Sequence, residues 1–353
     1  MLLNGLIQVE VRSAGMLRGE DLLGLKKMLE ESPVVKQYRE DNRPERGSIV
    51  FDCVPMTLLE LLRQARRQRY EEFLEHLTPE DAFSVGLPIV DGAVRIPAVS
   101  TLNTFVNHVL NAELGPMLSE EFAAFFVSKG TGQSVATMDS SPVEASKNNR
   151  SAEYNPHYKQ HMFKAHISML DGVPLTMTFT DGNVHDNTQA EDLMKRSGKA
   201  GLGPRHCGCM QGDAAYSPFL TYANCNQILD VPMIAGKASN HVFHKGVDEE
   251  MIDRAVNRLW KEGGNPKAPL RTKLRFLFKK GMEKMVGVFL RNRRMGDPGA
   301  DELYKNRGDC EKMHAYMDRW VGFDAIGLHR KYREQQVRGK FLCVQMLCVL
   351  FGA

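Results

Sequence analysis

The strongest constraint on the fold is a pair of β-rich runs, residues 163–170 and 173–180, separated only by Asp171-Gly172. An Asp-Gly pair between such runs favours a two-residue turn, so the runs are predicted to form neighbouring antiparallel strands. Further segments alternate around this hairpin: apolar runs at 134–138, 207–211 and 231–235, and helical patterns at 186–194 and from 217 onward. Strands and helices in this order predict a mixed α/β layer architecture.

Residues 1–128 have helical patterns instead. Thr78-Pro79-Glu80-Asp81 combines a capping hydroxyl, a proline in the first turn and two acids at the positive end of the helix dipole, which predicts a helix start. Further starts are expected at Ser100-Thr101-Leu102 and Ser119-Glu120-Glu121. Leucines between residues 58 and 62 recur near helical spacing and are expected to form core. We predict a helical N-terminal region at 1–128 and an α/β domain at 129–353, interrupted by an insertion at 238–300.

Composition is that of a soluble globular protein, with 42% hydrophobic and 25% charged residues. No apolar run reaches the roughly 18–20 residues of a membrane helix, and the longest candidate, residues 341–351, is interrupted by Gln345. The seven cysteines are too scattered for a disulfide framework. We therefore expect a cytoplasmic protein with no membrane partner.

Positive charge is concentrated in one part of the chain, although the net charge is only +3. Residues 251–340 carry 22 Lys and Arg against 11 Asp and Glu, and residues 263–296 carry ten basic residues and one acid. Such a field attracts phosphate backbones, so this mainly helical stretch is a candidate nucleic-acid surface. A solvated helix face with no partner is the alternative.

Three acids carry the candidate chemistry. Asp139 is expected at the end of the first strand, Asp213 at the end of the fourth, and Glu311 on a helix predicted over 301–320. Carboxylates that leave strand ends converge where α/β sheets bind ligands. Three converging carboxylates repel one another unless hard cations such as Mg²⁺ or Mn²⁺ neutralise them. The spacing alone is weak evidence, because a chain with 43 acids offers many such triples.

The residues around each acid resemble the DDE transposases of prokaryotic insertion sequences, in particular those with a Tyr-Arg-Glu-Lys signature. The matching segments are Thr137-Met138-Asp139-Ser140-Ser141, Gly182-Asn183-Val184-His185-Asp186, Gly212-Asp213-Ala214-Ala215-Tyr216-Ser217, Val231-Pro232-Met233-Ile234, and a helix with Tyr304, Arg307 and Glu311. The resemblance covers residues 134–351. It implies an RNase H-like mixed sheet flanked by helices, with the basic, mainly helical insertion placed before the last catalytic helix.

The resemblance also implies a function. The activity would be metal-dependent cleavage of DNA at transposon ends, followed by strand transfer into target DNA. Two Mg²⁺ or Mn²⁺ ions would be held by Asp139, which bridges both, and by Asp213 and Glu311. The partners would be double-stranded DNA, meaning the terminal inverted repeats and the target, and a second copy of the chain. Residues 1–128 would contribute to DNA binding, and the protein would be nucleoid-associated.

DNA contacts are expected from side chains near the third acid and in the basic stretch. They are Tyr304, Arg307, Arg319, Lys237, Lys273, Arg275, Lys279, Lys280, Arg293 and Arg294. Arg319 is included because the lysine position of the signature, seven residues after Glu311, is occupied by Asp318. One step along a helix turns a side chain by about 100°, so Arg319 is an imperfect substitute.

Trp260 in the insertion has two interpretations. It could stack on an extruded base, as an aromatic residue does in related enzymes that pass through a DNA hairpin. Packing in the core of the insertion is the interpretation that we favour.

Three alternatives remain open from the sequence. Zinc could bind His206, Cys207, Cys209 and Cys225, or His157, His161 and His166, although the paired C-x-x-C spacing is missing. The chain could instead be a catalytically inactive, transposase-derived DNA-binding protein. It could also be an RNase H-like nuclease that cleaves DNA without strand transfer.

Overall fold

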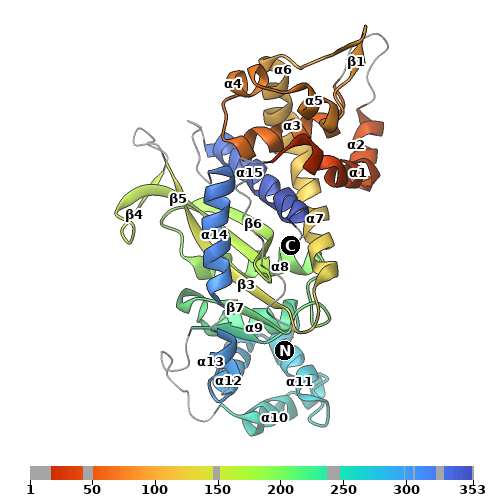
Figure 1. The fold of residues 1–353 in the computed structure, drawn as a ribbon. Helices are drawn as coiled ribbons and strands as arrows, with labels where there is room; N and C mark the ends of the chain where they lie inside the picture. The colour runs from red at the N-terminus through yellow and green to blue at the C-terminus, as the bar shows by residue number, and fades with distance from the viewer. Residues whose placement is uncertain are drawn as a thin grey trace. The chain divides into compact units, whose positions relative to one another are not determined.

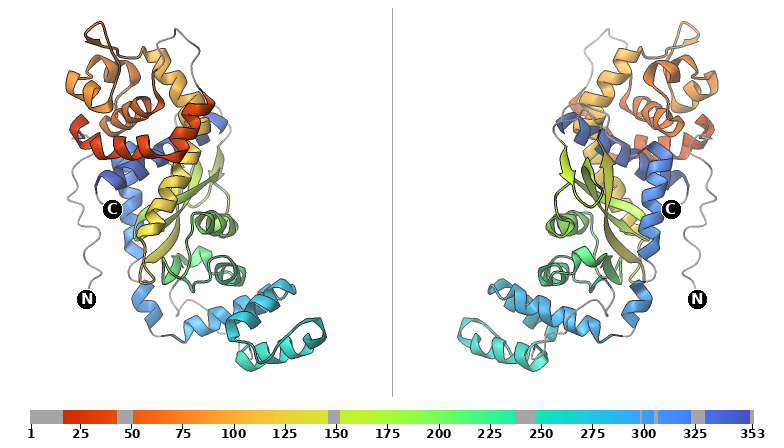
Figure 2. Two further views of the ribbon diagram at one scale, coloured as in Figure 1. Left: turned by 90° about the vertical axis from the view of Figure 1, so that its right-hand side faces the viewer. Right: turned by 90° about the vertical axis from the view of Figure 1, so that its left-hand side faces the viewer.

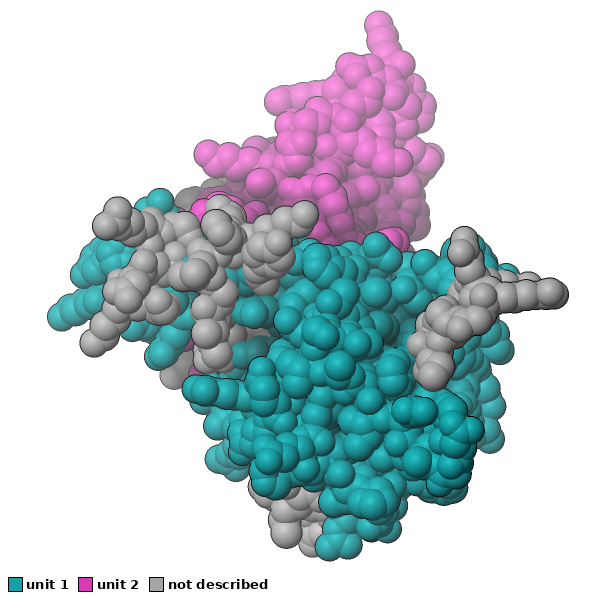
Figure 3. Space-filling model, turned by 90° about the horizontal axis from the view of Figure 1, so that it is seen from above, with its two compact units in different colours: residues 1–123, 143–163, 313–353 teal, residues 124–142, 164–312 magenta. Residues whose placement is uncertain are grey.

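A computed structural model describes residues 17–42, 51–145, 152–236, 247–297, 299–304, 307–322 and 330–351. The chain forms two compact units, coloured separately in Figure 3. The first comprises residues 1–123, 143–163 and 313–353, and the second comprises residues 124–142 and 164–312. Within the described ranges, no helix is both long enough and apolar enough to cross a membrane.

The first unit is mainly helical. Its N-terminal elements are the 3₁₀ helix η2 (Gly19–Leu22), helices α1 (Leu23–Glu31), α2 (Pro33–Asp41), α3 (Cys53–Arg66), α4 (Tyr70–Glu75), α5 (Pro79–Val85) and α6 (Val99–Thr104), the π-helix η3 (Phe105–Leu114), and a small hairpin of β1 (Ile89–Val90) and β2 (Ala93–Val94). The leucines of α3 are fully buried, which confirms that they form core.

Helix α5 begins as its sequence predicts. The Thr78 hydroxyl accepts a hydrogen bond from the Asp81 N–H at 3.1 Å, and the Asp81 carboxylate accepts one from the Thr78 N–H at 3.3 Å. This reciprocal capping box satisfies two donors that the first turn leaves unpaired. The start predicted at Ser119 is wrong, because helix α7 (Gly115–Lys129) continues directly from η3. Ser119 therefore has no helix end to cap, and its hydroxyl donates to the Gln345 side chain at 2.7 Å.

The closing helices differ partly from expectation. The helix predicted over 301–320 is divided into α13 (Gly299–Tyr304) and α14 (Gly308–Val321), with Gly308, a weak helix former, at the start of α14. The last helix, α15 (Arg330–Leu350), is confirmed almost as predicted from 331–351. Its apolar half is buried, and it packs against η3 and α3.

A mixed sheet provides the frame for the site. Its strands are β3 (Val135–Glu144), β4 (Glu153–Asn155), β5 (Gln160–Leu170), β6 (Val173–Asp181), β7 (Cys209–Gly212) and β8 (Met233–Ala235), in the order β4-β5-β3-β7-β8, with β6 paired to β5 (Figure 1). The β5–β6 hairpin is confirmed: Asp171 and Gly172 both have positive φ, 49° and 81°, as the favoured two-residue turn requires. Strands β3, β7 and β8 are parallel.

Helices of the second unit follow the strands. The 3₁₀ helix η4 (Asp186–Gln189) leads into α8 (Ala190–Lys199), and η5 (Ala214–Tyr216) leads into α9 (Phe219–Ile228). Helix α8 packs against β6 and α9. His185 is the N-cap residue of η4 and makes no side-chain cap bond. Asp186 binds a lysine of β5, as described below. The mixed α/β architecture with flanking helices is therefore confirmed.

The basic insertion is helical in its described part, as predicted. It contains α10 (Glu249–Arg258), the 3₁₀ helix η7 (Trp260–Glu262), α11 (Leu270–Lys279) and α12 (Glu283–Met295), drawn in cyan and blue in Figure 2. Ile252, Val256, Leu277 and Val286 form its core, and α12 packs closely on α9. Our preference for a core position of Trp260 is wrong, because 60% of this residue is exposed. It occupies a short surface turn, where the small core of the insertion does not reach it.

Candidate active site

Two of the three predicted acids are placed side by side by strand register. Strands β3 and β7 pair in parallel as far as Met138 of β3 and Gly212 of β7. The next residue after Met138 is Asp139, and the next after Gly212 is Asp213. Asp213 follows its strand, as predicted. Asp139 does not end its strand, since β3 continues to Glu144, but it lies where the pairing with β7 stops. Both carboxylates therefore leave the same edge of the parallel strands.

The electrostatics of Asp213 reflect this crowding. Burial raises the pKa of Asp213 above its ordinary value, and the negative charges of Asp139 and Asp186 raise it further. The Ala215 N–H, which donates to Asp213 Oδ1 at 2.8 Å, and the positive charge of Arg307 both oppose the rise in pKa. The net result is a partly buried carboxylate in a field that favours a bound cation.

Arg307 lies between the first and third acids. Its Nη2 atom is 3.8 Å from Asp139 Oδ2 and 3.5 Å from Glu311 Oε1. Its Nη1 atom donates to the Tyr304 hydroxyl at 3.2 Å. Tyr304 is the last residue of α13, Arg307 directly precedes α14 and Glu311 lies in its first turn, so the three signature residues do not share one helix. A spacing of four residues still brings Arg307 and Glu311 together.

Glu311 does not contribute to a ready metal cage. Its side chain is 67% exposed and pairs with the guanidinium of Arg307. Within the described ranges, no three His, Cys, Asp or Glu side chains lie close enough together to hold one metal ion. The structure thus places Asp139 and Asp213 on neighbouring strands. Glu311 is linked to Asp139 only through Arg307, whose guanidinium contacts both carboxylates.

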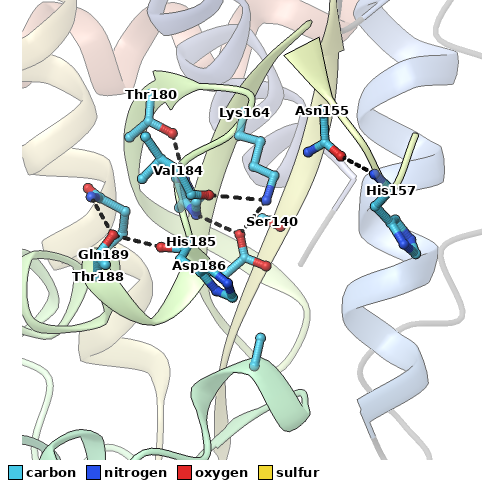
Figure 4. Close-up of polar contacts among 12 residues, drawn as sticks. Ser140, Asn155, His157, Lys164, Thr180, Val184, His185, Asp186, Thr188 and Gln189 are labelled. Carbon is cyan, nitrogen blue, oxygen red and sulfur yellow. Dashed lines mark hydrogen bonds and ion pairs between the residues drawn. The ribbon is translucent and has the colours of Figure 1, made fainter. Parts of the chain in front are cut away.

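The sequence did not lead us to a partly buried polar cluster around Lys164 and Asp186 (Figure 4), close enough to Asp213 for the Asp186 charge to raise its pKa. The Lys164 ammonium, from β5, donates to Asp186 Oδ1 at 3.0 Å and to the Val184 carbonyl at 3.2 Å. His166, two residues along the same strand, has Nδ1 3.5 Å from Asp186 Oδ1 and Nε2 2.8 Å from the Thr180 hydroxyl. Burial lowers the pKa of His166 to about 4, so its ring is neutral at pH 7. The available signal was a lysine and a histidine at alternate positions of an otherwise apolar strand.

The cysteines considered for zinc are buried thiols. Cys207, Cys209 and Cys225 are buried, and burial raises the pKa of Cys207 to about 12 and that of Cys209 to about 11. These thiols are therefore protonated at pH 7 and pack as small apolar side chains.

The candidate DNA contacts fall into two groups. Several have carboxylate partners: Lys273 with Asp253 at 2.5 Å, Arg275 with Asp230 at 3.4 Å, Lys280 with Glu262 at 2.9 Å, and Arg294 with Asp297 at 2.8 Å. Lys273 is also buried, so its expected role as a surface contact is not supported. Lys279, Arg293 and Arg319 are exposed. Lys237 lies outside the described residues.

A mixed sheet flanked by helices, with two acids at adjacent parallel strands, is consistent with an RNase H-like transposase domain. Among family models, the one described as Transposase DDE domain matches residues 130–347. The chain belongs to this family, and its general function is that of a transposase, in DNA recombination and the transposition of insertion sequences. Comparisons with curated proteins and with solved structures found no match.

Proposed function

We propose that this transposase cleaves DNA at transposon ends and joins the freed ends to target DNA, with Asp139, Asp213 and Glu311 as its catalytic carboxylates. The observation that carries this proposal is the register of β3 and β7, which places Asp139 and Asp213 at matching positions of neighbouring parallel strands. Two carboxylates placed side by side repel each other and so destabilise the fold, which argues against a purely structural role for this pair.

The donor set suits divalent metal ions. All three candidate ligands are carboxylates, which Mg²⁺ and Mn²⁺ prefer. Burial, with a further contribution from the charge of Asp139, raises the pKa of Asp213, which is consistent with a site that a cation would stabilise. Glu311 is largely exposed, so its side chain can change rotamer at little packing cost. We propose two ions held by these residues. When bound, they supply charge stabilisation at the attacking and leaving oxygens of an in-line displacement.

The protein side chains then have distinct tasks. Water attacks the scissile phosphorus, the P–O3′ bond breaks, and a 3′-hydroxyl is released. That hydroxyl attacks a phosphodiester of the target, whose own 3′-oxygen leaves. Arg307 is placed to donate to a non-bridging phosphate oxygen, and the Tyr304 hydroxyl helps to orient its guanidinium. The Ala215 N–H holds the Asp213 carboxylate in one orientation.

DNA would lie on basic surfaces and on the N-terminal region. We propose contacts from Lys279, Arg293 and Arg319, which are exposed, and a DNA-binding role for residues 1–128. Trp260 is exposed in the insertion and is proposed to stack on an unpaired base. A homodimer on the two transposon ends, associated with the nucleoid, completes the proposal.

The test uses the full chain, Mg²⁺ and DNA that carries the terminal inverted repeats of its element. Asp139→Asn and Asp213→Asn should each lower cleavage at least about 10³-fold while DNA affinity is retained. The matched control is Asp91→Asn, in a turn with φ of 55° that asparagine also accepts, with 91% of the side chain exposed. Binding without cleavage by the unmutated chain would favour the inactive DNA-binding alternative. Cleavage without joined products would favour a nuclease.

A further inference from the structure

Gln211 is a buried polar residue in the middle of the catalytic sheet. It is fully buried in β7, in register with Thr137 of β3 and Ile234 of β8. Asp213 is two positions further along the chain, directly after β7, so the two side chains project toward the same face of the sheet. An amide at such a position is costly to bury unless it makes a hydrogen bond, and an apolar side chain would pack equally well.

The amide makes its bond to a distant helix. Gln211 Nε2 donates a hydrogen bond to the Leu303 carbonyl oxygen at 2.8 Å. The two residues are 92 positions apart in the sequence. Leu303 lies in the last turn of α13, where carbonyl groups have no partner within the helix. The bond therefore caps the end of α13 with a side chain of the sheet.

Apolar packing secures this end of α13 only weakly. The Leu303 residue is 39% exposed and lines a pocket of about 670 Å³ together with Cys209, Leu274 and Leu290. A side chain that borders an open pocket has few atoms around it to fix its position. The directional hydrogen bond from Gln211 is thus a stronger restraint on the helix end than the burial of Leu303.

The helix end leads directly into the candidate site. Tyr304 follows Leu303, accepts a hydrogen bond from Arg307, and Arg307 contacts both Asp139 and Glu311. We propose that Gln211 is a positioning residue that anchors the C-terminal end of α13 to β7, the strand that leads into Asp213, and so fixes the position of Tyr304 and, through the Tyr304–Arg307 hydrogen bond, of Arg307 beside Glu311. The catalytic part of this inference rests on the proposed function, whereas the structural part does not.

Hydrogen–deuterium exchange of the DNA-free full chain tests the structural part. Gln211→Met keeps the buried volume but removes the donor, and should speed amide exchange in α13 roughly three- to tenfold. Peptides from α8 and from α15 should exchange as in the unmutated chain. The matched control is Thr137→Val, which removes a buried hydroxyl without a partner among the described residues, at the register position opposite Gln211. It should leave α13 unchanged.

Single-turnover cleavage tests the catalytic part. Gln211→Met should lower the cleavage rate about tenfold with unchanged DNA affinity and unchanged melting temperature within about 3 °C. Gln211→Glu, which sets a carboxylate against the Leu303 carbonyl, should lower it further. Unchanged exchange in α13 overturns the proposal, as does faster exchange spread evenly over α8, β5 and α13. If the unmutated chain does not cleave, the proposed function fails, and the exchange experiment still decides whether Gln211 anchors α13.

Discussion

Because Arg307 contacts two candidate metal ligands, its removal is expected to change the affinity of the site for a divalent cation. Its guanidinium stands 3.8 Å from Asp139 and 3.5 Å from Glu311, where it neutralises charge that a divalent cation would otherwise meet. At 3.8 Å a unit charge pair is worth between about 1 kcal/mol in water and about 4 kcal/mol at an effective dielectric of 20. Because the Glu311 side chain is 67% exposed, solvent screens its share strongly. We take about 1–2 kcal/mol for the total.

The perturbation is Arg307→Met in the full chain without DNA. Removal of the competing cation should raise the affinity for Mn²⁺ about 5- to 30-fold, which is 1–2 kcal/mol converted at 1.4 kcal/mol per tenfold change. Isothermal titration calorimetry or Mn²⁺ electron paramagnetic resonance measures this affinity directly, without catalysis. The same variant should bind end DNA more weakly and cleave it more slowly, because the phosphate contact is lost.

The matched control is Arg196→Met, which removes the same charge from the Asp192 pair on α8 and should leave Mn²⁺ affinity unchanged. An Asp139→Asn change on the Arg307→Met background should abolish the gain. An Mn²⁺ affinity that stays constant or falls in Arg307→Met refutes the reasoning, because the guanidinium would then not share a site with the metal.

Three further predictions concern stability, each measured by urea unfolding. Gly172→Ala should cost about 1 kcal/mol, because the hairpin turn holds this residue at φ 81°; no loss would contradict the turn. Lys164→Met should cost about 3–5 kcal/mol, because it leaves the Asp186 carboxylate partly buried without its cation, and adding Asp186→Asn should recover part of the loss. Folding lowers the pKa of His166 to about 4, so as the pH falls the unfolded chain takes up the proton before the folded protein does. Stability should therefore be full above about pH 6.5 and fall by up to about 1.4 kcal/mol per pH unit down to pH 4, a slope that His166→Gln should remove.

Local signals in the sequence were sufficient for much of the fold. The Asp171-Gly172 turn and the capping box at Thr78 act over two to four residues, so their outcome depends little on the rest of the chain. Asp139 and Asp213 could be predicted as neighbours because the carboxyl ends of parallel strands lie at the same edge of a sheet. The break between α13 and α14 escaped prediction, although the sequence marks it: the polar run Lys305-Asn306-Arg307-Gly308-Asp309 interrupts the apolar pattern there.

Long-range polar pairs could not be predicted. Nothing near Gln211 in the sequence indicates a bond to Leu303, and the alternation of Lys164 and His166 on β5 does not indicate which acid Lys164 will pair with. Such contacts depend on how the strands and helices pack. Trp260 shows the opposite failure, since a large aromatic residue was expected in the core and lies on the surface. Burial of one residue depends on the size of the local core, which composition does not report.

The paired register of β3 and β7 also limits which length changes the gene can tolerate. Because side chains alternate between the two faces of a strand, the loss of one codon within residues 135–139 or 209–213 would turn an acid to the opposite face of the sheet. Segments that merely join the strands are under no such restriction. Heritable insertions and deletions in active descendants of this element should therefore collect in the loops that join the strands and be purged within those two stretches.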